Sequence, residues 1–128
     1  MNEEVYKSVQ TREIVKYVRE EYGDELEFLW EKFSSNAIWR NQRNRKWYGA
    51  LLIVNGRKLG LETDKDVEII DLRFEKGQAR EFAASNENVL PGYHMNKDNW
   101  ITVVLDGRMK MGKIIELLNQ SYRIAEGK

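Results

Sequence analysis

The chain has 128 residues, of which 41% are hydrophobic and 33% charged, so it can build the core of one domain. Its 21 basic and 21 acidic side chains balance to a formal net charge of zero, whereas a dedicated nucleic-acid-binding domain is usually basic. It contains no cysteine, which excludes disulfides, thiolate metal sites and cysteine nucleophiles. No signal-peptide pattern and no apolar run of roughly 20 residues is present, so we expect a soluble cytoplasmic protein without membrane association.

The charges are unevenly distributed along the chain. Residues 32–61 hold seven basic side chains and no Asp or Glu, so the rest of the chain carries a net charge of −7. Just upstream, residues 20–31 hold six acidic side chains and no Lys or Arg. The basic block could therefore contact an acidic partner, including the acidic block of a second copy of the chain.

Three segments are predicted to be helical. Residues 3–22 and 111–124 carry apolar side chains mostly at three- and four-residue steps, which predicts an amphipathic helix near each end of the chain. Ser8 or Thr11 could cap a restart, so residues 1–10 are interpreted as a frayed extension or a separate turn. Gly23 is expected to end the first helix. Residues 75–84 predict a short middle helix, which Gly77 weakens.

Five segments are predicted to be strands: 37–40, 47–54, 58–62, 67–74 and 100–105. The run 47–54 is nearly all apolar, which is typical of a strand buried on both faces. Asn55 and Gly56 form a type I′ turn signal, so this strand is expected to return through residues 58–62 as an antiparallel hairpin. Residues 26–33 are interpreted as a loop that docks an aromatic cluster. The pattern predicts one α+β domain over residues 1–128, an antiparallel sheet of hairpin strands with the terminal and middle helices on one face.

The stretch 90–107 contains the only proline and the only histidine, and it runs from a turn into a strand. Six of its residues resemble the signature of the MmcQ/YjbR family: Tyr93, His94, Met95, Asn96, Lys97 and Trp100. A weaker likeness covers nearly the whole chain, from about residue 11 to residue 125. The resemblance implies a fold with a "double wing", two hairpins presented together, and a DNA-binding role proposed for the family from that fold.

Two basic turns are the candidates for such wings, chosen for their charge. They supply six candidate nucleic-acid contacts: Arg40, Arg43, Arg45, Lys46, Arg57 and Lys58. Lys and Arg can neutralise phosphates, and the Asn and Gln side chains between them can contact phosphates or base edges. The aromatic residues beside the first turn can stack on unpaired bases. The competing interpretation is that these charges solubilise turns and that Trp47 and Tyr48 belong to the core.

His94 is the remaining candidate for chemistry. Without cysteine or a second histidine, the spacing around His94 is a weak signal for a metal. We expect a buried, hydrogen-bonded structural residue, with ligand contact and catalysis as the alternatives. Because no nucleophile elbow or phosphate-binding loop occurs, we expect no enzymatic activity, no cofactor and no metal.

These observations favour a cytoplasmic, non-enzymatic module that binds the DNA backbone through its basic turns. The alternative is a protein-interaction or small-ligand module without nucleic acid. In that case the basic block would contact an acidic partner or the acidic block of another copy.

Overall fold

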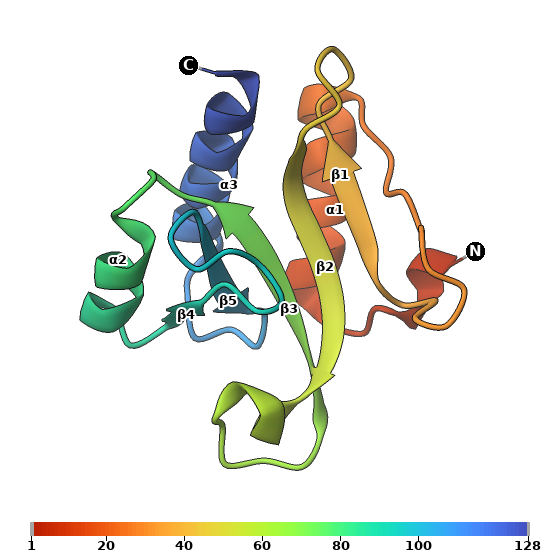
Figure 1. Cartoon of the computed structure of the whole chain (residues 1–128). Helices are drawn as coiled ribbons and strands as arrows, with labels where there is room; N and C mark the ends of the chain where they lie inside the picture. Colours follow the sequence, from red (N-terminus) through yellow and green to blue (C-terminus); the bar gives the residue numbers. More distant parts are fainter. Residues whose placement is uncertain (1, 128) are drawn as a thin grey trace.

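The computed structural model describes residues 2–127, which form three α-helices and a five-stranded antiparallel sheet (Figure 1). The strands are β1 (Ala37–Arg40), β2 (Trp47–Asn55), β3 (Asp66–Arg73), β4 (Val89–Pro91) and β5 (Trp100–Val104), in the order β1-β2-β3-β5-β4. The helices are α1 (Val9–Tyr22), α2 (Ala79–Ser85) and α3 (Met111–Glu126). The predicted α+β class and antiparallel sheet are confirmed.

The helices cover one face of the sheet, which we call the helix face. Ile14 of α1 and Leu118 of α3 are fully buried in one cluster with Ile70 and Leu72 of β3, and Ala79 brings α2 into the same cluster. Figure 1 shows α1 and α3 behind the strands. The apolar stripes that predicted the two terminal helices therefore form the principal core of the molecule.

The N-terminal helix begins later than predicted, at Val9, and is preceded by a separate 3-10 helix, η1 (Asn2–Val5). Ser8 is the N-cap: its Oγ accepts from the Thr11 N–H at 3.3 Å and donates to the Leu105 carbonyl at 2.6 Å. The Ser8 N–H also donates to the Glu68 carboxylate, at 3.0 Å. These contacts hold Ser8 extended, so a continuous helix cannot pass through it. The described residues before α1 are docked rather than frayed, and Tyr6 is buried.

The hairpin predicted through Asn55 and Gly56 is wrong. Asn55 instead caps a 3-10 helix, η2 (Gly56–Leu59), and its Oδ1 accepts from the Arg57 N–H at 2.9 Å. Gly56 lies against Thr63, where a Cβ would collide, so the glycine serves close packing rather than a tight turn. The partner of β2 is β3, which offers a longer apolar run than residues 58–62 do. Residues 56–65 form the connecting loop.

Two elements near the end of the sheet also differ from the prediction. The middle helix covers Ala79–Ser85 rather than residues 75–84, because Gly77 has a φ of +82°, which no right-handed helix contains. Strand β4 was not predicted; it is three residues long and pairs only with β5. Pro91 fits there because an edge strand has one side without ladder hydrogen bonds.

The second face of the sheet is covered by loops and is called the loop face. Its buried side chains form a smaller apolar cluster: Ile38, Ala50, Leu52, Val54, Ile69 and Val104. The loop of residues 92–99, which carries the family-like signature and is called the signature loop, lies in front of the strands in Figure 1. The two faces of β2 are therefore covered differently: helices cover one face and loops cover the other.

Candidate functional site

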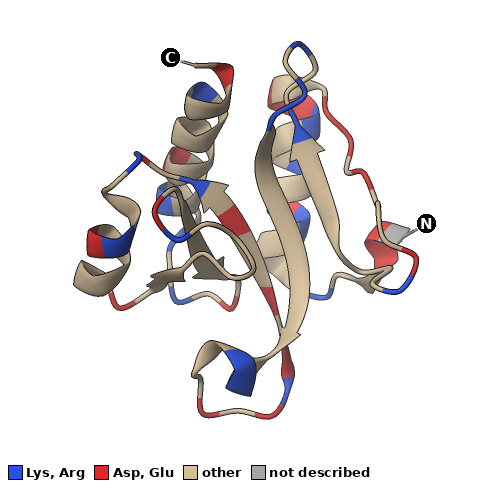
Figure 2. Cartoon of the chain, in the orientation of Figure 1, with Lys and Arg blue, Asp and Glu red and all other residues tan. Residues whose placement is uncertain are grey.

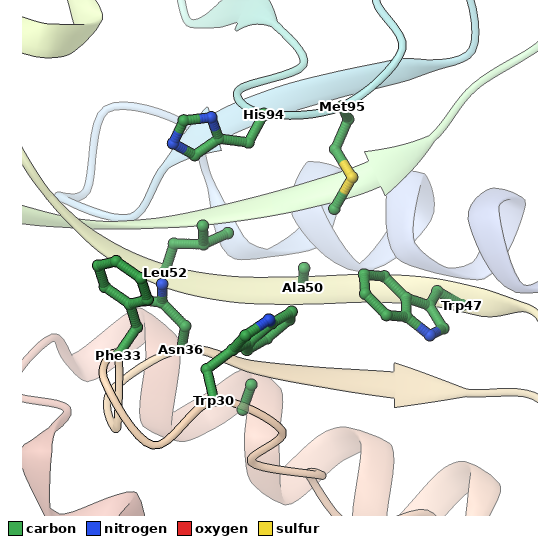
Figure 3. Close-up of a pocket in the computed structure, with 9 residues that line it drawn as sticks. Trp30, Phe33, Asn36, Trp47, Ala50, Leu52, His94 and Met95 are labelled. Atoms are coloured by element: carbon green, nitrogen blue, oxygen red, sulfur yellow. The ribbon is translucent and has the colours of Figure 1, made fainter.

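A groove on the loop face is the main candidate site. It encloses about 330 Å³ and is lined by nine residues: Trp30, Phe33, Asn36, Ala37, Trp47, Ala50, Leu52, His94 and Met95. Figure 3 shows the three segments that build it. Strand β2 is the floor, the loop of residues 23–36 is one wall, and the signature loop supplies His94 and Met95 from the other side. Volume and apolar lining both fall within the range of small-ligand sites.

Large aromatic side chains remain accessible at this groove. Phe33 is 60% exposed and Trp30 is 37% exposed. The Trp30 and Trp47 rings meet edge to face, with centroids 5.9 Å apart and an interplanar angle of 87°. The expected docking of residues 26–33 is therefore only partial. Phe28 stacks against Tyr6 on the helix face, whereas the aromatic residues after it face the groove or solvent.

The groove has two polar side chains, Asn36 and His94. The Asn36 Oδ1 accepts from the Ile53 N–H at 3.3 Å, which ties the amide to β2. His94 is exposed, has a φ of +60° and lies beside the Tyr93 ring, at 4.1 Å between ring centroids. The prediction of a buried, hydrogen-bonded His94 is therefore wrong. The left-handed backbone of the turn directs this side chain outward, whereas the expectation assumed a residue that enters a strand.

The rest of the signature holds the loop in place. The Tyr93 N–H donates to the Thr102 Oγ1 at 2.8 Å, and the Thr102 hydroxyl donates to the Asp71 carboxylate through a short hydrogen bond. The Lys97 ammonium donates to the Gly92 carbonyl at 3.0 Å. The Asn96 Oδ1 accepts from a backbone N–H within the loop. Tyr93, Asn96 and Lys97 thus fix the signature loop, and His94 and Met95 line the groove.

Trp100, the last signature residue, is buried at the start of β5. Its ring lies under the Arg73 guanidinium, 4.8 Å from the ring centroid. Arg73 also donates to the Trp47 carbonyl through a short hydrogen bond. This contact connects the end of the signature to the strand that forms the groove floor.

Asp71 is a fully buried carboxylate beneath the signature loop, and it was not among the predicted site residues. It pairs with Ala50 of the groove floor on one side and with Thr102 on the other. Burial raises its pKa to about 7, although the Thr102 hydrogen bond, the Lys97 charge and the Tyr93 N–H oppose the shift. Its Oδ2 has no hydrogen-bond partner among the described residues. The only signal in the sequence was an Asp within an apolar strand.

The two predicted basic turns lie at opposite ends of β2. The turn of residues 41–46 precedes Trp47, and η2, with Arg57 and Lys58, follows Asn55. Figure 2 shows the basic positions of these two turns, coloured blue, at opposite ends of the molecule. A nine-residue strand separates them by roughly 25–30 Å. They are therefore not presented side by side as two wings, because the full length of β2 lies between them.

Acidic side chains neutralise part of this basic set. Three of the six candidates form ion pairs within the chain: Arg40 with Glu27 at 3.0 Å, Arg43 with Glu126 at 3.1 Å and Arg57 with Asp64 at 2.9 Å. Lys46 and Lys58 are exposed, and Arg45 donates to the Gln42 side chain at 3.0 Å. Part of the acidic block thus has partners in its own chain, including Glu27 and Asp24, which accepts from the Tyr48 hydroxyl at 2.6 Å. The free charge of both blocks is smaller than the sequence suggests.

Within residues 2–127, no cluster of three or more His, Asp or Glu side chains is arranged to hold a metal ion. No helix in that part of the chain has both the length and the apolar character needed to cross a membrane.

Other proteins are similar to this chain over most of its length. The family model YjbR matches residues 19–124. The uncharacterized protein YyaQ of Bacillus subtilis is 38% identical over 117 residues, which cover 91% of this chain and 98% of that protein. A crystal structure of a Pseudomonas syringae protein superposes with a TM-score of 0.84 and 32% identity, covering 89% of this chain and 97% of that one.

A Deinococcus radiodurans protein with a DUF419 domain is 20% identical with a TM-score of 0.59, covering 82% of this chain and 70% of that one, and shares the fold. The resemblance seen in the signature thus extends over most of the chain. This protein belongs to the YjbR family.

Proposed function

We propose that this protein is a non-enzymatic binding module that takes a compact organic ligand in the groove on its loop face. The supporting observation is a 330 Å³ apolar cavity whose walls include a 60% exposed Phe33 and a partly exposed Trp30. Exposed aromatic side chains gathered around a hollow are typical of binding surfaces, because their burial by a ligand is favourable. The same side chains contribute little to the helix-face core.

The signature loop also supports the proposal. Its anchoring residues hold His94 and Met95 over the groove floor, and its hydrogen bonds to Thr102 and Gly92 fix the wall before any ligand arrives. A site that is formed in advance loses less conformational entropy on binding. The strongest local likeness to the family therefore coincides with one wall of the groove.

The test is a ligand-observed NMR screen with three small probes: benzamide, cyclohexanecarboxamide and tetramethylammonium. Wild-type protein is expected to bind at least one of them, and Ala50→Leu is expected to abolish binding because the larger side chain fills the hollow above β2. Leu29→Ala is the matched control, since Leu29 is 45% exposed on the same wall but does not line the groove. If Ala50→Leu does not fold, Trp30→Ala replaces it. Failure of all three probes to bind the wild type contradicts the proposal.

A second candidate is binding of the DNA backbone by the turn of residues 41–46. Its supporting observation is that Arg43, Arg45 and Lys46 are exposed in one turn. If DNA is the ligand, replacing Arg43 and Arg45 together with Glu should sharply weaken binding. Each lost phosphate contact should lower the log–log salt slope by about 0.9 on duplex DNA.

Lys58→Glu is the control for this second candidate, because Lys58 lies at the far end of β2 and should not affect a site at the first turn. Binding is measured on duplex DNA at two salt concentrations. Unchanged affinity in the folded double variant, or no binding by the wild type at low salt, removes this candidate.

A further inference from the structure

The two ends of the groove differ in chemistry. At one end, the Trp30 and Trp47 rings meet beside Ala50, whose small side chain leaves space above β2 (Figure 3). At the other end, Asn36 and His94 approach Leu52 from opposite sides of the groove. A ligand that fills the groove therefore meets two indole rings at one end and, at the other, the Asn36 and His94 side chains with the Phe33 ring beside Asn36 (Figure 3).

The polar end is suited to a hydrogen-bonding edge. Because the Asn36 Oδ1 is occupied by the Ile53 N–H, the amide nitrogen is the group of Asn36 that remains to donate. Neutral His94 supplies one donor and one acceptor, and its contact with the Tyr93 ring restricts the orientation of the imidazole. Together these side chains offer donors and one acceptor to a single edge of a ligand.

The lining residues include no Asp, Glu, Lys or Arg. A cation could gain from the aromatic faces, but no carboxylate lines the groove to neutralise it. A phosphate or a nucleic-acid backbone would find no lysine or arginine in the lining. The groove therefore favours a neutral ligand of small size.

We propose that the ligand of this groove is a free, neutral, planar heteroaromatic compound of about the size of a nucleobase. This inference rests on the proposed binding role of the groove. The ring lies against the Trp30 and Trp47 side chains, where stacked or edge-to-face contacts add to simple burial. Its hydrogen-bonding edge faces Asn36 and His94, which select rings that carry acceptors and donors over plain hydrocarbons.

The test compares matched ligands by titration, followed in amide proton–nitrogen NMR spectra. Adenine and benzamide should shift groove resonances, whereas cyclohexanecarboxamide, which has the same amide on a puckered ring, should bind roughly tenfold more weakly. Tetramethylammonium should bind more weakly still. If cyclohexanecarboxamide or tetramethylammonium binds as tightly as benzamide, the inference of a neutral planar ring is overturned while the groove remains a binding site.

Two variants test the polar end. Asn36→Asp keeps an oxygen for the Ile53 N–H but removes the donor, so adenine and benzamide should bind roughly tenfold more weakly. His94→Phe keeps a ring and removes both hydrogen-bonding nitrogens, so it should weaken adenine more than benzamide. Leu29→Ala should leave both affinities unchanged. Unchanged adenine affinity in both polar-end variants would refute the assigned edge.

Two further outcomes separate this inference from other accounts. A ten-residue deoxyadenosine oligonucleotide that binds far more tightly than adenine and also shifts residues 41–46 would overturn the free-compound assignment in favour of a nucleic-acid base. If none of the compounds shifts any groove resonance, the proposed function itself fails and the inference fails with it.

Discussion

The two faces of the sheet are built by different means. On the helix face, the core between the helices and the sheet includes five fully buried side chains: Ile14, Ile70, Ile101, Ile114 and Leu118. On the loop face, the buried cluster is smaller, and partly exposed aromatic side chains surround a hollow. Strand β2 belongs to both faces: Leu51 packs toward the helices, and Leu52 lies in the groove.

The difference teaches that one strand can serve stability and binding at once. Side chains alternate along a strand, so neighbouring residues of β2 meet separate environments. The helix face is close-packed and supplies much of the hydrophobic stabilisation. The loop face leaves space unfilled, and its cover depends on hydrogen bonds within and beneath the signature loop, such as the bond from Tyr93 to Thr102. Changes on the two faces should therefore have separable effects.

The largest expected effect contrasts two leucine truncations. Leu118→Ala removes a fully buried side chain from the helix face and should lower the free energy of unfolding by about 3 kcal/mol. Leu52→Ala enlarges a hollow that already exists, so its cost should be about 1–2 kcal/mol, nearer the transfer term alone. Denaturant unfolding of both variants measures the contrast. Equal costs would show that the loop face is as tightly packed as the helix face.

The next effect concerns pH and Asp71. Because its folded-state pKa of about 7 lies above the ordinary value of 3.8, the folded protein binds more protons than the unfolded chain between these pH values. The free energy of unfolding should therefore fall as pH rises from about 4 to about 7, by an amount on the order of a few kcal/mol, and level off above that range.

Asp71→Asn keeps an acceptor for the Thr102 hydroxyl and cannot ionise, so its stability should vary less with pH. Urea unfolding of both proteins from pH 4.5 to 8 provides the measurement. Asp66→Asn is the control, because Asp66 is exposed at the start of the same strand. Parallel pH profiles for wild type and Asp71→Asn would contradict the assignment of a raised pKa.

The sequence predicted the helix face better than the loop face, for physical reasons. Amphipathic periodicity reports burial against a sheet, so Ile114 and Leu118 could be assigned to a core from their spacing alone. The hairpin prediction failed because Asn55 and Gly56 form a capping and packing arrangement that involves Thr63 and Asp64, contacts that local turn statistics do not contain.

The groove was missed because it is assembled from three segments far apart in sequence. Trp30 and Phe33 were recognised as an irregular aromatic group, but nothing local indicated that Trp47 and His94 would face them. His94 was misplaced for a related reason, since its left-handed backbone depends on the turn that the anchored loop adopts. The signature residues identified the loop that forms one wall of the groove, but not which of its side chains line the groove.

The most direct test of the contrast between the two faces is the variant Phe33→Ala, for which we expect the smallest change in stability. Phe33→Ala removes a 60% exposed side chain from the groove wall, so the free energy of unfolding should stay within about 0.5 kcal/mol of wild type. Benzamide affinity, measured on the same preparation, should fall several-fold because the wall of the groove is lost. Wild-type affinity together with a loss of more than about 1.5 kcal/mol of stability would show that Phe33 serves the core and that the loop face is not a binding face.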